Sequence, residues 1–370
     1  MRIAITGSRG FVARNLIVRL REAGHDDVVE ISHDFDTERL ETAVAGAELV
    51  FHLSGVNRPQ NTDEFRTGNA GFTAQLCAAL AKVAPHAAVA FSSSTQAVLD
   101  NDYGISKLEA EEILLAHGAT TGATISIFRL TNIFGKWSRP NYNSAVATFC
   151  HNVARDLPIR IDNPQAPLKL IYIDDVIDCF LPLLDPAKRT NGFVSAGPEY
   201  DTTVGEVGEI IKSFRTSRDT LTTLPVGIGL LRALYSTYVA SLEPASFAYD
   251  LPMYVDPRGT FAEMLKTPDC GQFSYFTAHP GVTRGEHYHH SKTEKFLVIK
   301  GNAHFGFRHI ETGETHEIVT SGEKAQIVET VPGWTHNITN IGQDEMIVML
   351  WANEVFDRDR PDTIGMKVTP

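Results

Sequence analysis

The chain has few cysteines, and their spacing forms no motif. Its 370 residues contain four cysteines, with no Cys-x-x-Cys among them. This argues against a disulfide framework and against a cysteine-rich zinc site, and it predicts the reduced thiols of a cytoplasmic protein. The four are Cys77, Cys150, Cys179 and Cys270.

Long apolar runs and a basic excess are also missing. No stretch is apolar enough to span a bilayer, and GSRG at residues 7–10 interrupts the N-terminal apolar run before any cleavage site. We therefore expect no membrane association and no signal peptide. The net charge of −12 argues against nucleic acid as a partner, because phosphate neutralisation needs clustered Lys and Arg. With 43% hydrophobic residues, a chain of this length can form two domains.

The first half alternates between strand and helix patterns. This order predicts a parallel sheet with helices on both faces, a Rossmann-like doubly wound α/β fold, in which ligands bind at the carboxyl ends of the strands. We expect strands at residues 2–6, 28–31, 48–53 and 87–92, and helices at residues 11–23, 38–45 and 68–82.

A glycine pattern follows the first predicted strand and opens the first predicted helix. The pattern is Gly7-x-x-Gly10-x-x-Ala13. The glycines allow a tight turn and bring backbone N–H groups close to a pyrophosphate, which also faces the positive end of the helix. The alternative is an ordinary glycine-rich turn. The candidate cofactor-binding residues here are Gly7, Ser8, Arg9, Gly10, Phe11 and Val12.

The end of the second strand decides between NADPH and NADH. Ser32 and His33 follow this strand, and Arg9 in the glycine turn could reach a 2′-phosphate, which favours NADPH. Asp34 lies just beyond and would suit the ribose 2′-hydroxyl of NADH, so the choice stays open.

Tyr103 and Lys107 are the candidate catalytic pair. Four residues apart on a helix, they share one face, so we expect the ammonium to lower the pKa of the tyrosine and make it a usable acid near neutral pH. The preceding strand ends in hydroxyl side chains at residues 92–95, which could orient a carbonyl group. The alternative is a solvated helix face.

Six segments together resemble the extended short-chain dehydrogenase/reductases. They are TGSRGFVA (6–13), FHLSGVNRP (51–59), FSSST (91–95), YGISK (103–107), FRLTNIFG (128–135) and YIDDV (172–176). The resemblance covers about the first 240 residues and implies hydride transfer at a nicotinamide with a triad of Ser94, Tyr103 and Lys107. Ser93 and Thr95 are adjacent alternatives. The loop between serine and tyrosine is shorter than is usual in this family, so we expect an unusually open pocket mouth. The implied cofactor contacts are Leu53, Ser54, Gly55, His33, Tyr103 and Lys107.

Basic and amide side chains gather after the predicted sheet. As a group they would suit the two phosphates of a UDP-sugar. The alternative for any one of them alone is a solvated surface residue. The candidate substrate-binding residues are Arg129, Asn132, Lys136, Arg139 and Arg160.

The second half changes to short strands separated by turns. We interpret the polar residues 213–223 as a loop and residues 230–240 as a helix. Short strands at regular spacing predict a small β-barrel or sandwich, and hence domains at residues 1–245 and 246–370. The expected strands are residues 271–278, 294–300, 303–310, 314–319, 325–329 and 345–352.

Histidines and one glutamate in this half are candidate metal ligands. His287 and His289 lie two apart and would face the same side of a strand, Glu294 follows, and His336 ends the segment PGWTH. Three imidazoles and a carboxylate suit zinc, and less selectively iron or manganese. The spacing resembles the cupin family and implies these four ligands, with His290 pointing away. The alternative is a polar barrel rim without metal.

A second resemblance overlaps the first. DPRGTFAE (256–263), GQFSYF (271–276) and GVTRGEHYH (281–289) are similar to the 3,5-epimerases of 4-keto-6-deoxy nucleotide sugars. In that family the histidine matching His287 is the base, so base and metal-ligand roles compete for this residue. If His287 binds metal, the base is another group, for which the candidates are His290, Tyr288, Tyr275 and Lys292.

The domain order resembles bifunctional capsular-polysaccharide enzymes in which a reductase precedes a cupin. The resemblance implies that the barrel inverts C3 of a UDP-4-keto-2-acetamido-2,6-dideoxy-L-hexose before NADPH-dependent reduction, on the way to UDP-N-acetyl-L-fucosamine. We also expect a homodimer, because cupin barrels readily pair. The alternatives are a reductase whose barrel is only a metal-stapled dimerisation module, a sugar-nucleotide sensor, and an iron-dependent dioxygenase.

Overall fold

The computed structural model describes the chain except residues 33, 253, 257–258, 262–264, 266–270 and 355–358. The first of its two compact units comprises Met1–Phe134, Tyr142–Ser144 and Leu168–Asp201, and the second comprises Gly135–Asn141, Ala145–Pro167 and Thr202–Pro370. The predicted domain division at residue 245 stays a prediction; the contacts group residues 202–245 with the C-terminal strands.

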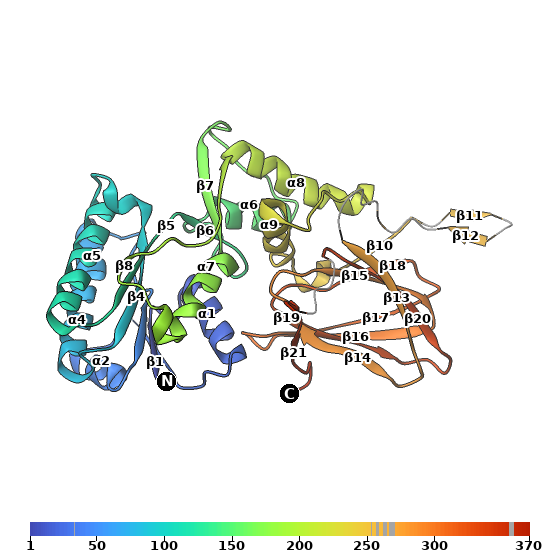
Figure 1. Cartoon of the computed structure of the whole chain (residues 1–370). Coiled ribbons are helices and arrows are strands. Elements are labelled where there is room, and N and C mark those ends of the chain that lie inside the picture. Colours follow the sequence, from blue (N-terminus) through green and yellow to red (C-terminus); the bar gives the residue numbers. More distant parts are fainter. Residues whose placement is uncertain (33, 253, 257–258, 262–264, 266–270, 355–358) are drawn as a thin grey trace. The chain divides into compact units, whose positions relative to one another are not determined.

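The first unit is built on a six-stranded parallel sheet of order β2-β1-β3-β4-β5-β8 (Figure 1). The four strands predicted in this half are all present, with ends shifted by at most two residues. A three-stranded sheet of order β6-β7-β9 accompanies it. The strands are β1 (Ile3–Thr6), β2 (Val28–Ile31), β3 (Leu49–His52), β4 (Ala88–Ser94), β5 (Ile125–Leu130), β6 (Asn132–Phe134), β7 (Pro167–Tyr172), β8 (Gly192–Phe193) and β9 (Glu199–Thr203).

Helices cover both faces of this sheet. Figure 1 shows α2, α4 and α5 on one face and α1 and α7 on the other, as the parallel βαβ pattern predicts. Asn101 caps α5 by accepting a hydrogen bond from the Gly104 N–H at 2.8 Å, which fixes where the helix with the candidate tyrosine begins. The helices are α1 (Phe11–Glu22), α2 (Thr37–Val44), α3 (Asp63–Arg66), α4 (Phe72–Val83), α5 (Asp102–Thr121) and α7 (Ile173–Phe180).

The second unit contains two five-stranded antiparallel sheets, of order β10-β18-β15-β20-β13 and β17-β16-β19-β14-β21. The predicted fold class, a doubly wound α/β fold followed by an all-β cupin-like region, is confirmed. A β11-β12 pair lies apart from both sheets. The strands are β10 (Ala248–Asp250), β11 (Tyr254–Asp256), β12 (Gly259–Phe261), β13 (Gln272–Ala278), β14 (Thr283–Tyr288), β15 (Glu294–Lys300), β16 (Asn302–His309), β17 (Thr315–Ser321), β18 (Gln326–Glu329), β19 (Trp334–Asn340), β20 (Met346–Ala352) and β21 (Ile364–Gly365).

The predicted loop at residues 213–223 is wrong. Most of it lies in α8 (Val204–Thr220), which begins with a capping box between Thr203 and Glu206. The polar composition belongs to the outer face, whereas Val207, Ile211 and Phe214 bury the other. The predicted helix at residues 230–240 is found as α9 (Gly229–Val239), and α6 (Ala145–Val153) joins it.

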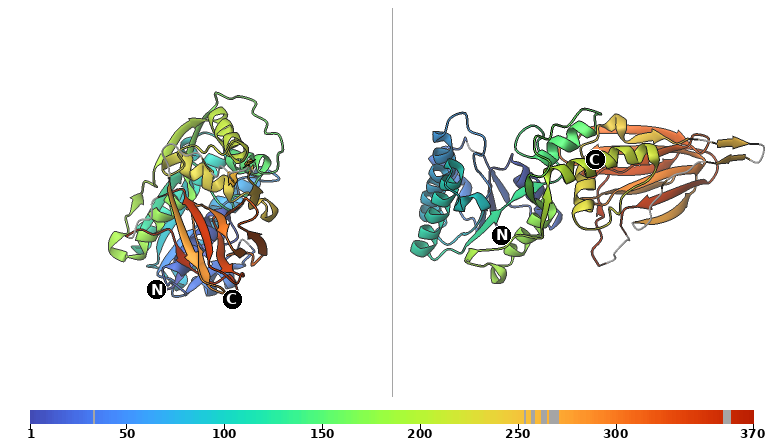
Figure 2. Two further views of the ribbon diagram at one scale, coloured as in Figure 1. Left: turned by 90° about the vertical axis from the view of Figure 1, so that its right-hand side faces the viewer. Right: turned by 90° about the horizontal axis from the view of Figure 1, so that it is seen from above.

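Helix α8 is attached to the C-terminal sheets, which we call the barrel, by a cluster of three charged side chains. Arg218 in α8 and Lys295 in β15 both donate hydrogen bonds to the carboxylate of Glu329 in β18. Figure 2 gives two further views, in which α8 is yellow-green and the strands of the second unit are orange to red. The helices of residues 202–245 therefore pack with the barrel.

Two further expectations can be compared with the described residues. No helix among them has the length and apolar character needed to cross a membrane. Their thiols, Cys77, Cys150 and Cys179, are free, and Cys270 lies outside the described residues.

Candidate active site and candidate metal centre

The glycine turn after β1 packs closely against the backbone after β3. Gly7 has φ +67°, and a Cβ placed on it would lie 2.9 Å from Ser54 Cα. Gly10 caps α1 without a side-chain hydrogen bond, since a glycine has no side chain to occupy the N–H groups at the start of this helix. These features fit the phosphates of a dinucleotide, which need close backbone approach and a helix N-terminus.

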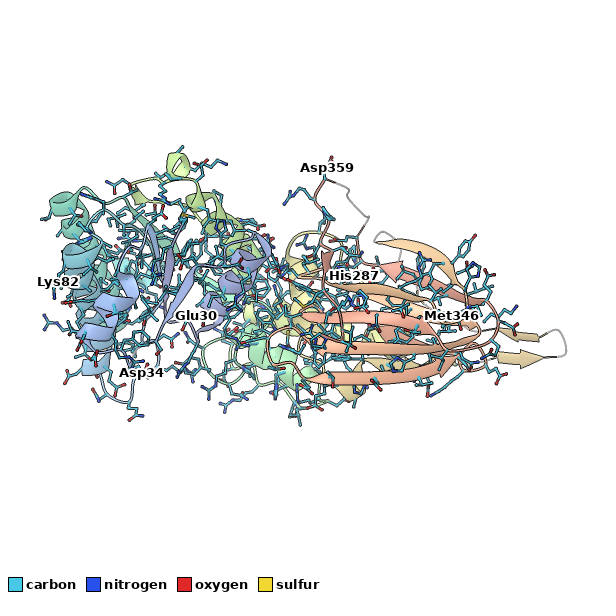
Figure 3. The ribbon with its side chains drawn as sticks, turned by 90° about the horizontal axis from the view of Figure 1, so that it is seen from below. Glu30, Asp34, Lys82, His287, Met346 and Asp359 are labelled. Carbon is cyan, nitrogen blue, oxygen red and sulfur yellow. The ribbon has the colours of Figure 1, made fainter. Side chains whose placement is uncertain are left out.

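The residues after β2 are only partly described. Ser32 is buried and donates a hydrogen bond to the carboxylate of Asp34, and Figure 3 labels Asp34 and Glu30 in this region. Arg9 is exposed, and His33 lies outside the described residues. The preference for NADPH therefore stays a prediction.

A buried histidine holds the loop after β3 in place. The Thr6 hydroxyl accepts hydrogen bonds from the N–H groups of Leu53 and Ser54 at 3.1 and 3.2 Å. His52 lies between two hydroxyls, with Nδ1 2.8 Å from Thr6 and Nε2 2.8 Å from Thr73. Since Thr73 gives its own proton to a backbone carbonyl, His52 carries its proton on Nε2. Burial, together with a nearby lysine charge, lowers the pKa of His52 to about 3, so the network is neutral.

The structure distinguishes between the three adjacent hydroxyl residues after β4. Ser94 is the one whose side chain lies close enough to Tyr103 to lower its pKa, and its hydroxyl also accepts a hydrogen bond from the Gln96 N–H at 3.1 Å. Ser93 instead donates to the buried carboxylate of Glu111. Thr95 is exposed. The geometry therefore favours Ser94 as the partner of Tyr103.

Lys107 lies beneath this pair on α5. Its Nζ donates to the Ser92 carbonyl at 2.7 Å and lies 4.2 Å from the centre of the Phe91 ring. A Cβ placed on Gly55 would lie 3.7 Å from the same Nζ. The predicted cofactor loop and the predicted catalytic lysine are therefore neighbours.

The predicted effect of Lys107 on the pKa of Tyr103 is wrong in this structure. Burial raises the pKa of Tyr103, and the hydrogen bond with Ser94 opposes that rise without cancelling it. The lysine is the more strongly affected group, because burial lowers its pKa to about 7 while the charge of Glu111 acts in the opposite direction. Burial therefore brings the pKa of Lys107 close to neutral pH.

Arg129 is bound within the protein. Its Nε and Nη2 donate to Glu111 at 3.0 and 2.6 Å, and its guanidinium lies 4.3 Å from the centre of the Phe193 ring. Two of its nitrogens are thus already engaged, and its predicted contact with substrate stays a prediction that depends on the remaining one.

The predicted substrate-binding residues are divided between the two units. Asn132, in the first unit, donates to the Lys169 carbonyl at 2.9 Å. In the second unit, Lys136 is buried with its Nζ 5.5 Å from the Trp137 ring centre, and the exposed Arg160 pairs with Asp162 at 2.7 Å. Arg139 also lies in the second unit. Their joint role in binding UDP stays a prediction.

The four predicted metal ligands converge in the second unit. His287 on β14 and His336 on β19 are paired across the two strands, and a bulge between Gly285 and His287 shifts the register there. His289 follows β14 and Glu294 begins β15. The candidate ligand atoms of His287, His289, Glu294 and His336 all lie within 4.8 Å of one another.

The charges and hydrogen bonds of this cluster suit a cation. Burial, with the neighbouring imidazoles, lowers the pKa of His287 to about 4, and burial also lowers the pKa of His336. Burial would raise the pKa of Glu294, but His289 and its other partners hold it well below its usual range. Within the described part of the chain, Nδ1 of His336 has no hydrogen-bond partner, and its Nε2 lies 3.5 Å from Glu294 Oε2. Neutral imidazoles and an ionised carboxylate are the forms that ligate metals, so these residues fit a divalent ion such as zinc.

The four candidates for an epimerising base lie in different surroundings. Lys292 contacts the cluster, with its Nζ 3.0 Å from Glu294 Oε1. The ring of His290 packs against Tyr288 with their centres 5.6 Å apart, and it is not among the converging ligands. Tyr275 is exposed on β13. Lys292 is therefore the candidate that contacts the cluster, where its ion pair with Glu294 favours the protonated ammonium.

Comparison with known families and proteins agrees with this arrangement. Residues 3–195 match the NAD dependent epimerase/dehydratase family, and residues 254–364 match the polysaccharide biosynthesis C-terminal domain. The chain belongs to the NAD dependent epimerase/dehydratase family. Family membership implies a nicotinamide cofactor, which the glycine turn and α1 fit.

This family member is similar over its whole length to two known proteins. It is 55% identical to the UDP-2-acetamido-2,6-beta-L-arabino-hexul-4-ose reductase of Pseudomonas aeruginosa, over 100% of this chain and 99% of the relative. It is 38% identical to the capsular polysaccharide assembling protein CapF of Staphylococcus aureus, with a TM-score of 0.68, over 99% of this chain and 100% of that structure.

A third similarity concerns the fold alone. UDP-glucose 4-epimerase of Thermotoga maritima matches with a TM-score of 0.52 at 20% identity, over 58% of this chain and 83% of that structure. The share of the chain that matches is consistent with the dinucleotide-binding fold of the first unit.

Three residues with evident roles in these sites were not predicted from the sequence. Glu111 joins Ser93 to Arg129, and its only sequence signal is its position four residues after Lys107 on the same helix face. His52 and Asp362 act through contacts between distant segments, for which the sequence gives no local signal.

Proposed function

We propose that the chain reduces the 4-keto group of a UDP-linked 2-acetamido-2,6-dideoxy-L-hexose. The observation that carries this proposal is the grouping of Ser94, Tyr103 and Lys107 beside the loop that packs on Gly7. The name of the Pseudomonas aeruginosa relative, a reductase of such a sugar, supports the substrate class.

The triad residues would supply and position the proton. Ser94 orients the ketone oxygen, and Tyr103 donates its hydroxyl proton to that oxygen as the carbonyl carbon receives a hydride. A nicotinamide cofactor, when bound, supplies the hydride. Lys107, whose pKa burial lowers to about 7, can then return a proton to Tyr103 near neutral pH.

We also propose that the barrel exchanges the proton at C3 of the same sugar before reduction. A ketone at C4 makes the C3 proton more acidic, and a divalent ion, most simply zinc, would polarise the substrate oxygens as a Lewis acid. The cluster of His287, His289, Glu294 and His336 would hold this ion. The base would be one of His290, Tyr288, Tyr275 and Lys292, of which Lys292 contacts Glu294 and must first lose its proton.

Three finer points belong to the same proposal. NADPH is the preferred cofactor because exposed Arg9 can reach a 2′-phosphate. A homodimer and the division into domains 1–245 and 246–370 complete it. The exposed apolar residues Ile105, Leu108 and Leu115 on α5 are consistent with self-association.

Proton exchange followed by NMR tests the proposal. The protein is incubated in D₂O with a UDP-4-keto-6-deoxy-N-acetylhexosamine without nicotinamide, and deuterium at C3 is measured. NADPH is then added, and reduction is followed by the loss of its absorbance. We expect deuterium at C3 in the first step and reduction in the second.

Each half of the proposal can fail separately. Reduction without deuterium uptake would leave a reductase whose barrel is a structural metal module. Deuterium uptake without reduction, by either NADPH or NADH, would contradict the role of the triad. Equal rates with NADPH and NADH would contradict the role given to Arg9.

A further inference from the structure

The C-terminal segment lies along the strands that carry the histidines of the metal cluster. Gly365 in β21 pairs with His287 in β14, and the Met366 N–H donates to the Glu286 carbonyl at 2.8 Å. The Thr335 hydroxyl, next to His336, donates to the Met366 carbonyl. Residues 362–368, which we call the C-terminal strap, therefore contact the backbone beside two of the proposed ligands.

Asp362 is the first residue of this strap. It contacts the segment around His289, the third histidine of the cluster. Its carboxylate accepts hydrogen bonds from three consecutive N–H groups, those of His290, Ser291 and Lys292, at 2.9, 2.7 and 2.7 Å. The Ser291 hydroxyl adds a fourth at 3.1 Å. Figure 3 shows His287 on the barrel and Asp359 on the segment that leads into the strap.

The backbone of Asp362 also contacts a ligand directly. Its carbonyl oxygen is hydrogen-bonded to Nδ1 of His289. A carbonyl can only accept, so Nδ1 must carry a proton, and Nε2 is the ring nitrogen that remains for a metal ion. Nε2 is the atom that lies 3.1 Å from Glu294 Oε2, inside the cluster.

We propose that Asp362 is a positioning residue for the metal centre, holding His289 in the tautomer and orientation that ligation requires. The inference rests on the metal centre proposed above. The carboxylate of Asp362 holds the backbone of residues 290–292, and its carbonyl holds the ring of His289. One residue therefore positions both the ligand and the connection between β14 and β15 that follows it. Partners of this kind usually alter metal affinity by about 10- to 100-fold when removed.

A purely structural cap would act differently. It would lower the stability of the metal-free protein, but once the protein is folded the ligands would bind metal as before. A positioning residue changes the affinity and the ligand geometry of the folded protein. Metal titration of folded protein separates these two roles, whereas enzyme activity would not.

The experiment uses the full chain freed of metal and titrated with Co²⁺ and with Zn²⁺ against a competing chelator. Visible absorption of Co²⁺ reports the ligand geometry, and circular dichroism and thermal melting of the metal-free protein report folding. The variants are Asp362→Ala and Asp362→Asn, which keeps the shape and one carbonyl acceptor. The matched control is Asp344→Ala, which removes an exposed carboxylate elsewhere in the same unit.

We expect Asp362→Ala to weaken binding of both ions by about 10- to 100-fold and to change the Co²⁺ spectrum. Asp362→Asn should weaken binding less, and Asp344→Ala should leave it unchanged. If Asp362→Ala fails to fold, the metal affinity of the Asp362→Asn variant provides the test. A folded variant that keeps the wild-type affinity and spectrum would overturn the positioning role. Wild-type protein that binds neither ion would instead overturn the proposed metal centre, and this inference with it.

Discussion

The proposed reductase site and the metal cluster both bury polar side chains, but they satisfy them in different ways. In the first unit, Lys107 binds a backbone carbonyl and Glu111 is paired with Arg129 and Ser93. In the second unit, Nδ1 of His336 has no hydrogen-bond partner within the described residues, and three imidazoles converge with Glu294. The first site is satisfied by its own neighbours, and the second has the donor set of a cation site.

This difference indicates how each site should respond to change. The reductase site is proposed to act by proton transfer. Substitutions there should therefore alter the rate of reduction and its pH dependence. A site of converging lone pairs depends on an ion, so it should respond to ligand removal and to chelators. The predictions below separate these responses.

The largest effect is expected from His336→Ala. Loss of one of four ligands should reduce metal affinity by orders of magnitude and abolish deuterium uptake at C3, whereas NADPH should bind as before. Metal content by elemental analysis and NMR exchange measure the two losses. His304→Ala, which removes a partly exposed imidazole of the same unit outside the cluster, is the control. A His336→Ala protein that keeps its metal would contradict the ligand set.

Tyr103→Phe should impair reduction and leave the metal centre intact. Without the hydroxyl, reduction should slow by about 100- to 10,000-fold, while metal content and C3 exchange stay at wild-type levels. Reduction is measured with substrate that has already been equilibrated at C3. Tyr142→Phe, which removes an exposed hydroxyl, should leave the rate unchanged. Full reduction by Tyr103→Phe would mean that another group donates the proton.

The second unit also contains a buried cluster of charged side chains that pair with one another. Glu329 is buried and accepts from both Lys295 and Arg218. Glu329→Gln should lower the free energy of unfolding by about 3–5 kcal/mol, because two buried cations lose their charged partner. Denaturant unfolding measures this loss.

The control for Glu329→Gln is an exposed ion pair in the same unit. Glu209→Gln breaks a pair with Lys212 on α8, which should cost less than about 1 kcal/mol. Similar losses of unfolding free energy for the two variants would mean that the buried cluster contributes no more to stability than an exposed ion pair. If chelation reproduced the loss seen with Glu329→Gln, the metal and ion-pair clusters would be energetically coupled.

Much of the fold and of both sites could be predicted, because their residues lie near each other in sequence or repeat a regular spacing. Strand alternation predicted the sheet, and the spacing of His287, His289 and Glu294 predicted a cluster that the structure brings together. The helix at residues 204–220 was missed in part because its exposed face is as polar as a loop. Local pattern cannot distinguish these two when burial comes from distant strands.

The interactions that could not be predicted join segments far apart in sequence. Asp362 reaches His290 across 72 residues, and Thr6 reaches His52 across 46. The direction of the pKa shift of Tyr103 also depends on burial, which follows from tertiary packing and not from the spacing to Lys107. Sequence spacing identifies which groups meet on one element, but burial decides their protonation.

The smallest effect expected concerns the buried lysine of the first site. Burial lowers the pKa of Lys107 from 10.5 to about 7, so between these values the unfolded chain holds a proton that the folded chain has released. The free energy of unfolding should therefore rise with pH in this window, by about 1–2 kcal/mol between pH 7 and pH 8.5. Below pH 7 both states are protonated, and this contribution to the slope disappears. Urea unfolding of wild type and Lys107→Met across this range measures the difference, which should be absent in the variant. Equal slopes in the two proteins would mean that Lys107 keeps its proton when folded, and Tyr103 would then lose the proton source assigned to it.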